Sequence, residues 1–586
     1  MCGIAGIYFN KKKQKTELES IVSKMVQQQV NRGPDDSGIF VDAKNNMALG
    51  HNRLSIIDLS KAGKQPMKLG YLQITFNGEI YNFLELKKGL EKKGYKFKTK
   101  TDTEVILALY AEYREKSFEM LRGMFAFGLW DGKNKKLFLI KDRYGIKPLY
   151  YYSDSEKLIF ASTVKAVVKS GLVPNEKEKK AWIGFLLFGS VPLPFTTIKN
   201  IFAIPAGHYL EFNINGKQQL VEYYNSLEFF QKKKEIIFDE AAKNVKILFC
   251  RSVNMHLVSD APLGIFLSGG LDSSAIAALA ALNREKPITT LSIIFDEQEF
   301  SEQKYQRLVA GKIKSDHQEI KITKEDFFNS FDEIFFAMDQ PTIDGINTFF
   351  IAKAAKEAGL KTVLSGLGAD EIFMGYPSFR RAFFLRKIQK LPEILKLPLR
   401  FFSLFGGRWS RLSYLKNDAP LNFYLAIRGL FTPREVAQML NISVKEVNNF
   451  INELAELTNL QINKLNNLDP TDLLSYLELK FYLQNQLLKD TDFMSMRHSI
   501  EVRVPFLDHE LVEYLSSLPP ALKLGNEVNK PLLVEAACDL LPSEIFTRHK
   551  MGFTFPFQKW MKEEGNFTGH WSRYWVKEIL ERNHYD

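Results

Sequence analysis

The sequence predicts an α/β multidomain protein, with an antiparallel sheet domain first, a doubly wound parallel sheet domain second, and a helical C-terminal extension. Three observations predict this fold class. The chain has 586 residues, more than one hydrophobic core normally serves, so at least two domains are expected. Up to about residue 225, short β-rich segments alternate with turn signals. After residue 236, short apolar runs alternate with helix-like segments, which is the rhythm of βαβ units.

The first half contains strand-like segments joined by turns. LQITFNGEIYNF is one such segment, FAFGLWDGKNKKLFLIKD carries two strand-like runs around the turn DGKNK, and LYYYSDSEKLIFAS resembles a second hairpin. FLELKKGLEKKG and TEVILALYAEYREK have the apolar spacing of helices. These elements predict an antiparallel sheet with packed helices in a first domain over residues 2–225.

The second half contains the short apolar runs LGIFLS, TTLSIIF, HQEIKI and KTVLS, separated by helix-like segments. This alternation predicts a parallel sheet in a second domain over residues 236–586. From Gly375 onward the pattern is mostly helical, and the stretch MSMRHSIEVRVPFLDHELVEYL is interpreted as helix and loop. The polar segment EFFQKKKEIIFDE is the candidate joint between the two domains.

The composition is that of an ordinary globular protein, with 45% apolar and 25% charged residues, which excludes disordered and collagen-like classes. Cys2, Cys250 and Cys538 lie far apart, so neither a disulfide framework nor a thiolate zinc site is expected. KKKQK follows only a short apolar stretch near the start, and no run of 18 apolar residues occurs. We therefore expect neither a signal peptide nor a membrane-spanning helix, and a cytoplasmic location.

The net charge is +11, and much of it lies between Arg380 and Lys416, where ten Lys or Arg face a single acid, Glu393. Phenylalanine and leucine interleave with these cations. One interpretation is weak contact of segment 380–416 with an anionic membrane surface, or with nucleic acid. The interpretation favoured from sequence is a set of short helices, broken at Pro392 and Pro398, that bury their apolar side and solvate their charges. No nucleic-acid partner is expected.

The chain begins MCGIAGIY, which places a cysteine directly after the first methionine. If the methionine is removed, Cys2 carries both a thiol, with a pKa of about 8.5, and an α-amine, with a pKa of about 7.7 to 8. The amine can then take the thiol proton, so the residue can act as a nucleophile. A cysteine at position two is weak evidence alone, and the interpretation requires partner residues.

The strongest chemical signal is GIFLSGGLDSSAIAALAAL, where a buried strand meets a helix through Ser268–Ser274. The glycines allow backbone N–H groups to surround an anion, and the helix N-terminus adds partial positive charge. Asp272 is placed to hold a magnesium ion. The string differs from the Walker loop and from GxGxxG, and it resembles the pyrophosphate loop of the ATP-pyrophosphatases.

Partners for Cys2 occur in four further motifs, NRGPDDSG, GHNRLSIID, FNGEIYN and KTDTEV. Together with MCGIAGIY they resemble the class II glutamine amidotransferase domain, and with SGGLDSS the chain resembles the glutamine-dependent asparagine synthetases from Cys2 to about residue 560. The resemblance implies an Ntn-hydrolase-like α/β/β/α sandwich followed by an adenine-nucleotide α-hydrolase-like domain. It implies ATP and Mg2+ as cofactors, glutamine and aspartate or another carboxylate as substrates, and a homodimer as a candidate assembly.

The resemblance also implies roles for individual residues. Cys2 is the expected nucleophile, and Asn77 with the backbone N–H of Gly78 forms the expected oxyanion hole. Arg53 is expected to bind the α-carboxylate of glutamine, and Glu79 and Asp102 its α-ammonium. The rest of the expected glutamine site is Leu54, Ser55, Ile56 and Ile57. The expected ATP site comprises Leu267, Ser268, Gly269, Gly270, Asp272, Ser273, Ile293, Ser365, Gly366 and Lys550, with Asp272 and Asp370 as magnesium ligands.

The chain departs from the family at three positions, all on the synthetase side. In LSGLGADE, Leu367 stands where a glutamate is usual, an acid associated with the aspartyl-adenylate intermediate. Phe493 and Val534 stand where arginines are common. Two interpretations of the acceptor therefore stay open. The first is asparagine synthesis from aspartate, and the second is the same mechanism on another carboxylate, such as a cell-envelope sugar or peptide precursor. Lys530 and the stretch around MSMRHS are interpreted as structural.

Overall fold

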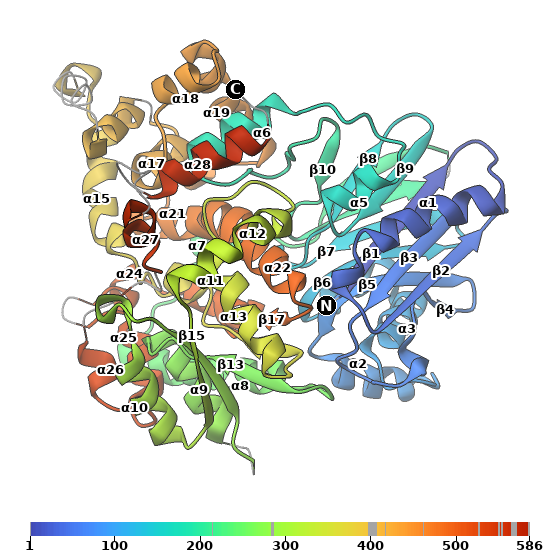
Figure 1. The fold of residues 1–586 in the computed structure, drawn as a ribbon, viewed down its shortest axis with the longest axis horizontal. Helices are drawn as coiled ribbons and strands as arrows, with labels where there is room; N and C mark the ends of the chain where they lie inside the picture. The colour runs from blue at the N-terminus through green and yellow to red at the C-terminus, as the bar shows by residue number, and fades with distance from the viewer. Residues whose placement is uncertain are drawn as a thin grey trace.

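The computed structural model describes residues 2–213, 215–282, 286–396, 407–416, 418–460, 462–525, 528–548, 551, 555–563 and 571–583. Within these ranges the first part of the chain forms two antiparallel sheets, the second part a parallel sheet, and the remainder is mostly helical (Figure 1). The two antiparallel sheets with their helices lie on the right of the view, in blue and cyan, and the parallel sheet with its helices lies at the lower left, mostly in green.

The two antiparallel sheets have the strand orders β10-β8-β9-β1-β3-β2 and β12-β11-β7-β6-β5-β4. The strands of the first are β1 (Gly3–Phe9), β2 (Asp36–Asp42), β3 (Met47–Arg53), β8 (Tyr150–Ser153), β9 (Lys157–Ala161) and β10 (Ile201–Ala203). Those of the second are β4 (Met67–Leu69), β5 (Leu72–Ile80), β6 (Gly123–Asp131), β7 (Lys136–Lys141), β11 (His208–Asn213) and β12 (Gln218–Glu222).

The two sheets pack face to face, because Ile4 and Tyr8 of β1 share one apolar cluster with Ala126 and Trp130 of β6. Helices α1 (Lys15–Gln27) and α5 (Val164–Lys169) cover the outer face of the first sheet. Helices α2 (Phe83–Glu91) and α3 (Asp102–Tyr113) cover the outer face of the second. The expected α/β/β/α sandwich is confirmed.

The parallel sheet has the order β15-β14-β13-β16-β17, so the chain runs outward from β13 on one side and then on the other. Its strands are β13 (Leu263–Phe266), β14 (Thr289–Ile294), β15 (Asp316–Lys321), β16 (Thr362–Leu364) and β17 (Glu501–Arg503). In such sheets ligands bind beyond the carboxyl ends of the strands where the order reverses, here between β13 and β16. Helices α9 (Leu271–Leu282), α10 (Gln303–Ile313) and α13 (Ile346–Glu357) pack on it.

Strand β17 corrects the interpretation of its sequence as helix and loop. Glu501 and Arg503 alternate with Val502, so the segment lacks the apolar run that marks the other parallel strands. All three residues are nevertheless buried, and β17 pairs in parallel with β16. The two charges are tolerated because Arg503 Nε donates to Glu501 Oε1 at 2.7 Å.

The remaining chain is helical, as expected. Its helices before β17 include α7 (Leu227–Gln231), α8 (Phe238–His256), α11 (Lys324–Asn329), α12 (Phe331–Ala337), α14 (Ala369–Ile372), α15 (Pro377–Gln389), α17 (Pro420–Arg428), α18 (Pro433–Met439), α19 (Val444–Leu457), α21 (Pro470–Leu477), the π-helix η8 (Glu478–Leu487) and α22 (Leu488–Arg497). After β17 come α23 (His509–Ser517), α24 (Pro520–Lys523), α25 (Pro531–Ala537), α26 (Glu544–Thr547), α27 (Phe557–Glu563) and α28 (Trp571–Arg582). None of the helices in the described ranges combines the length and apolar character that crossing a bilayer requires.

Helix α15 departs in part from the expectation that segment 380–416 buries its apolar side. Its buried side holds Phe379 and Ala382 but also Arg386 and Gln389, whereas Phe383 and Phe384 are exposed. Buried Arg386 is stabilised by hydrogen bonds to the Asp418 carbonyl at 2.9 Å and to Asn466 Oδ1 at 2.6 Å.

The end of the same segment meets the expectation, because Tyr414 and Leu415 are buried.

Buried ion pairs join the two halves of the chain. Arg32 donates two hydrogen bonds to the Asp492 carboxylate, at 2.6 and 3.0 Å. Arg122 does the same to Asp508, at 2.7 and 2.6 Å. All four side chains are at most 5% exposed. Because breaking one partner of such a pair leaves a buried charge, the pairs hold the two halves in one relative position.

Candidate active sites

The first site forms where Cys2, just before β1, meets Asn77 on β5. The backbone N–H of Cys2 donates to Asn77 Oδ1 at 2.9 Å. The Nδ2 group of Asn77 is buried and has no hydrogen-bond partner in the described chain. A buried donor without an acceptor costs free energy, so this group is suited to an oxygen that arrives with a ligand. The predicted pair of nucleophile and oxyanion donor is therefore brought together.

Gly78 follows Asn77 in β5 with φ of +146°, a conformation that side chains rarely adopt. A Cβ atom there would collide with the Met124 carbonyl of the neighbouring strand β6. The close approach of the two strands thus requires glycine, and the bend places Gly78 among the residues that line the site.

A small cavity of about 30 Å³ lies beside Cys2. The predicted residues that line it are Cys2, Arg53, Leu54, Ile56, Ile57, Gly78, Glu79 and Asp102. The cavity is also lined by residues that the sequence analysis did not name, Gly63, Gln65, Phe76, Thr101 and Thr103. Ser55 and Asn77 are not among them, although Asn77 contacts Cys2; the backbone N–H of Ser55 donates to Asp35 Oδ2 at 2.7 Å. The cavity has room for about one water molecule, so a larger ligand requires the site to open.

Arg53, in the wall of this small cavity, is bound to its own loop. Its guanidinium donates to the carbonyl of Ser60 at 2.7 Å and to that of Asp58. The loop after β3 therefore occupies the two guanidinium nitrogens of Arg53 that were predicted to bind a carboxylate. This loop also contacts the second half of the chain through Asp260. The backbone N–H of Asp260 donates to the Ile56 carbonyl at 3.0 Å, and its carboxylate oxygen Oδ2 accepts from the Asp58 N–H at 2.8 Å.

The two predicted acids, Glu79 and Asp102, are buried in this site. Burial raises the pKa of Asp102 to about 7, and burial together with the nearby Glu501 charge raises the pKa of Glu79 well above its usual range. Arg503 Nη2 lies 3.6 Å from Glu79 Oε1 and partly opposes this rise. A ligand ammonium would favour the charged carboxylates in the same way. Burial also raises the pKa of the Cys2 thiol, so forming the thiolate requires a base.

Arg32 is a residue of this site to which the sequence analysis gave no role. Its Nε donates to the Cys2 carbonyl at 3.2 Å, while its other nitrogens bind Asp492. Cys2 is thus positioned by an ion pair that reaches into the second half. The motif NRGPDDSG contains Arg32, but no pattern in the sequence indicates that Asp492 is its partner.

The second site lies beyond the carboxyl ends of β13 and β16. The loop Ser268–Ser273 follows β13 and leads into α9, and Ser268 Oγ lies 2.9 Å from Ser273 Oγ. Gly269 has φ of +77°, which glycine adopts readily. A Cβ on Gly366, in the loop after β16, would lie only 3.0 Å from the Ser273 nitrogen. The two loops therefore approach closely enough to form a cradle for phosphate groups.

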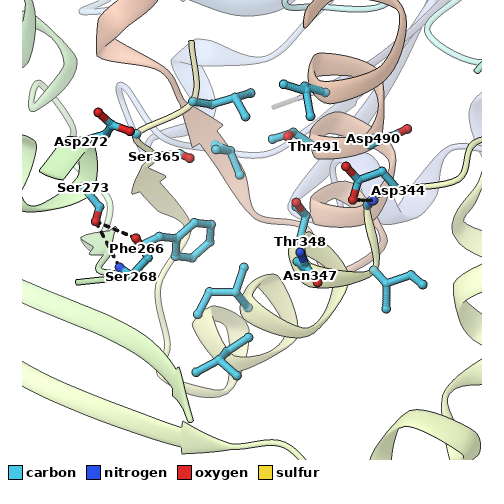
Figure 2. Close-up of a pocket in the computed structure, with 18 of the residues that line it drawn as sticks. Phe266, Ser268, Asp272, Ser273, Asp344, Asn347, Thr348, Ser365, Asp490 and Thr491 are labelled. Carbon is cyan, nitrogen blue, oxygen red and sulfur yellow. Dashed lines mark hydrogen bonds between the residues drawn. The ribbon is translucent and has the colours of Figure 1, made fainter. Parts of the chain in front are cut away.

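A cavity of about 520 Å³ opens at these loops, within the usual range for ligand sites. The predicted residues that line it are Leu267, Ser268, Asp272, Ser273, Ile293, Ser365, Gly366, Leu367 and Asp370. Gly269 and Gly270 are not among them, and Lys550 lies outside the described residues. Figure 2 shows Ser268, Asp272, Ser273 and Ser365 on one side of the cavity, and Asp344, Asn347, Thr348, Asp490 and Thr491 on the other. The sequence analysis missed the second group.

The interpretation of Lys530 as a structural residue is incomplete, because Lys530 contacts two acids that line this site. Its Nζ lies 2.6 Å from Asp272 Oδ1 and 2.6 Å from Asp370 Oδ1. It is almost fully buried. Carboxylate oxygens beside a phosphate cradle fit Mg2+, which usually takes one or two carboxylates together with substrate phosphates. The two acids therefore fit the predicted metal, and Lys530 holds them close together.

The far side of the cavity is acidic. Burial raises the pKa of Asp344, and burial with the neighbouring Asp344 charge raises the pKa of Asp490 well above its usual range. Among the described residues that line the cavity, none is Lys or Arg. A second cavity of about 210 Å³ adjoins it, shares Asp344, Tyr482 and Trp571 with it, and is lined by Arg428.

Comparisons with known proteins identify a family for each half of the chain. The family model for asparagine synthase matches residues 244–583, and the model for a glutamine amidotransferase domain matches residues 1–224. The chain belongs to the asparagine synthase family. It is 33% identical to asparagine synthetase (glutamine-hydrolyzing) 1 of Bacillus subtilis (strain 168), over 100% of this chain and 91% of the relative. It is 31% identical to asparagine synthetase (glutamine-hydrolyzing) 3 of the same organism, over 94% and 86%. It is 27% identical to amidase chry2 of Gibberella zeae, over 90% and 84%.

Proposed function

We propose that the chain is a glutamine-dependent asparagine synthetase that acts in the cytoplasm. Cys2 hydrolyses the amide of glutamine, and the ammonia reacts with aspartate whose β-carboxylate has been adenylated by ATP. The products are asparagine, glutamate, AMP and pyrophosphate. The observation that best supports the proposal is the buried, unpaired Nδ2 of Asn77 beside Cys2, because acyl transfer creates an oxyanion that needs such a donor.

In the glutaminase site, we assign the nucleophile to Cys2 once the first methionine is removed, with its own α-amine as the base. Asn77 Nδ2 and the Gly78 N–H stabilise the oxyanion. Arg53 exchanges its loop carbonyls for the α-carboxylate of glutamine when the loop opens. Glu79 and Asp102 receive the α-ammonium, which restores their charge.

In the synthetase site, ATP places its phosphates at the loop Ser268–Ser273 and its base near Leu267 and Ile293. Asp272 and Asp370 would hold Mg2+, which when bound neutralises phosphate charge. We assign Lys550 to the departing pyrophosphate. Asp344 and Asp490 on the opposite wall are placed to receive the α-ammonium of aspartate.

Ammonia must travel between the two sites without escaping as ammonium. Leu54 and Ile56, which line the glutaminase cavity, form an apolar cluster with Met496 of α22 in the second half. We propose that the path runs through this cluster, because apolar walls favour neutral ammonia over its protonated form.

A second candidate function keeps the mechanism and changes the acceptor. Leu367 lines the synthetase cavity and can neither bind an ammonium nor transfer a proton. The adjoining cavity with Arg428 offers space and a cation beyond what aspartate needs. These two observations favour a larger carboxylate, whereas the names of the bacterial relatives support aspartate.

The test is an incubation of purified protein with ATP, Mg2+, glutamine and aspartate, in which asparagine and pyrophosphate are both measured. Equal amounts of the two products are expected. The Cys2→Ala variant is expected to lose glutamine-dependent synthesis entirely and to retain synthesis from ammonium chloride. Glutamate release without asparagine would reject aspartate as the acceptor, and loss of both activities in a folded Cys2→Ala variant would reject separate sites.

A further inference from the structure

Helix α15 and the following 3-10 turn η5 (Glu393–Lys396) form an exposed apolar and basic surface. Its apolar members are Phe383, Phe384, Leu391, Ile394 and Leu395, which are 52%, 66%, 38%, 73% and 57% exposed. Its exposed cations are Arg380, Arg381, Lys387 and Lys390. We call these nine residues the α15–η5 surface. In Figure 1, α15 lies at the outer edge of the molecule, on the side away from the antiparallel sheets.

The buried side of α15 is mixed, and part of its apolar surface is exposed. Arg386 and Gln389 are 3% and 0% exposed beside buried Phe379, while Phe383 and Phe384 on the same helix face outward. Leaving a large apolar side chain in water costs about 1.5 to 3 kcal/mol relative to burying it. A cluster of five such residues is more than the scattered exposure that is normal in monomers.

The charges of this surface have one sign. Between Pro377 and Lys396 the only acid in the sequence is Glu393. Lys387 Nζ lies 4.4 Å from the centre of the Phe383 ring, so cation and aromatic side chains are interleaved and not segregated. This arrangement suits an interface in which rings and aliphatic side chains enter an apolar layer while ammonium and guanidinium groups meet anions at its edge.

We propose that the α15–η5 surface docks on an anionic membrane. Lipid headgroups supply the negative charge, and the acyl region receives Phe383, Phe384 and Ile394. A second copy of the chain fits less well, because it would place four exposed cations against four others. A single-stranded nucleic acid would stack on the phenylalanines but offers no apolar layer for Ile394 and Leu395.

The position of this surface gives docking a consequence. Tyr376, the residue directly before α15, lines the 520 Å³ cavity of the synthetase site. Docking would therefore hold the acceptor side of the enzyme near the bilayer surface. The inference does not depend on which carboxylate is amidated, because it concerns a separate part of the surface.

The test is flotation of the full-length protein with vesicles of phosphatidylcholine alone or with 30% phosphatidylglycerol, a composition chosen to supply about one anionic headgroup in three. Binding is expected only to the anionic vesicles and is expected to weaken as salt rises. Replacing Arg381, Lys387 and Lys390 together by Gln should weaken binding on the order of 100-fold, since each cation near such a surface contributes about fivefold. Phe383→Ser with Phe384→Ser should weaken it about tenfold or more.

Lys243→Gln with Ile247→Ser, an exposed cation and apolar residue on α8, is the matched control and should bind as the wild type does. Glutaminase activity verifies that every variant is folded. Three results would overturn the proposal: no binding to anionic vesicles, equal binding to neutral ones, or equal loss in the control. Concentration-dependent dimerisation that the Phe383→Ser and Phe384→Ser changes abolish would assign the surface to a second copy instead.

Discussion

The two sites of this chain differ in how far they are prepared for a ligand. The cavity at Cys2 holds about 30 Å³, and Arg53 in its wall is bound to the loop after β3, whereas the synthetase cavity holds about 520 Å³. We call the smaller site the closed site, because its loop occupies Arg53 and must exchange these hydrogen bonds for bonds with glutamine. The synthetase cavity already has a volume in the usual range for ligand sites. Opening is therefore a step at which the second half can influence the first.

The two sites also differ in how they handle buried charge. In the glutaminase site, acids lie in a low-dielectric region, and burial raises the pKa of Asp102 to about 7. In the synthetase site, Lys530 lies 2.6 Å from each of two acids, and their charges raise the pKa of the lysine against the opposing effect of burial. A ligand ammonium would therefore balance the acids of the first site, whereas the two acids of the second site are already paired with Lys530.

The largest effect is expected when that cation is removed. Lys530→Met leaves Asp272 and Asp370 facing each other, so the phosphate cradle loses a positive charge close to the reacting groups. Pyrophosphate formation should fall about 100- to 1,000-fold, the usual cost of losing one group that stabilises developing charge. Steady-state pyrophosphate release with saturating ammonium chloride measures this.

The control for this change is the activity of the other site. Hydrolysis of glutamine by Lys530→Met should stay within about twofold of the wild type, because the two sites bind their ligands separately. Lys530→Arg keeps the charge and should recover part of the rate. A parallel fall of both activities, with a lowered melting temperature, would reduce Lys530 to a structural role.

The contrast between the sites also explains what the sequence could predict. The sheet topologies and the loop after β13 were predictable because apolar runs, glycines and turn residues have local patterns. Strand β17 was missed, because its charges are satisfied only in the folded chain. Asp344 and Asp490 lie far apart in sequence and face the phosphate loop only after α13 and α22 pack together. The aromatic side of α15 was misjudged because no local signal shows that Arg386 finds partners inside.

A smaller effect is expected from pH, and it should affect the closed site. Since the pKa of Asp102 is raised to about 7, the carboxyl is protonated below that pH and no longer attracts an ammonium. The KM for glutamine should therefore rise as the pH falls below 7, by up to about tenfold per pH unit. Asp102→Asn should show a high KM and should lose the part of this rise that depends on Asp102. A wild-type KM that is constant from pH 5.5 to 8 would contradict the assignment.

The smallest expected effect concerns the contact that ties the closed site to the second half. Asp260 holds the glutaminase loop through the Ile56 carbonyl and the Asp58 N–H. Asp260→Ala removes the acceptor for Asp58, and one hydrogen bond is worth about 0.5 to 1.5 kcal/mol, so the loop should open about two- to tenfold more readily. Glutaminase activity without ATP and aspartate should rise by that factor, while its stimulation by these substrates shrinks. Asp260→Asn retains an acceptor oxygen and should resemble the wild type, so an equal rise in both variants would show that charge, and not the hydrogen bond, keeps the loop closed.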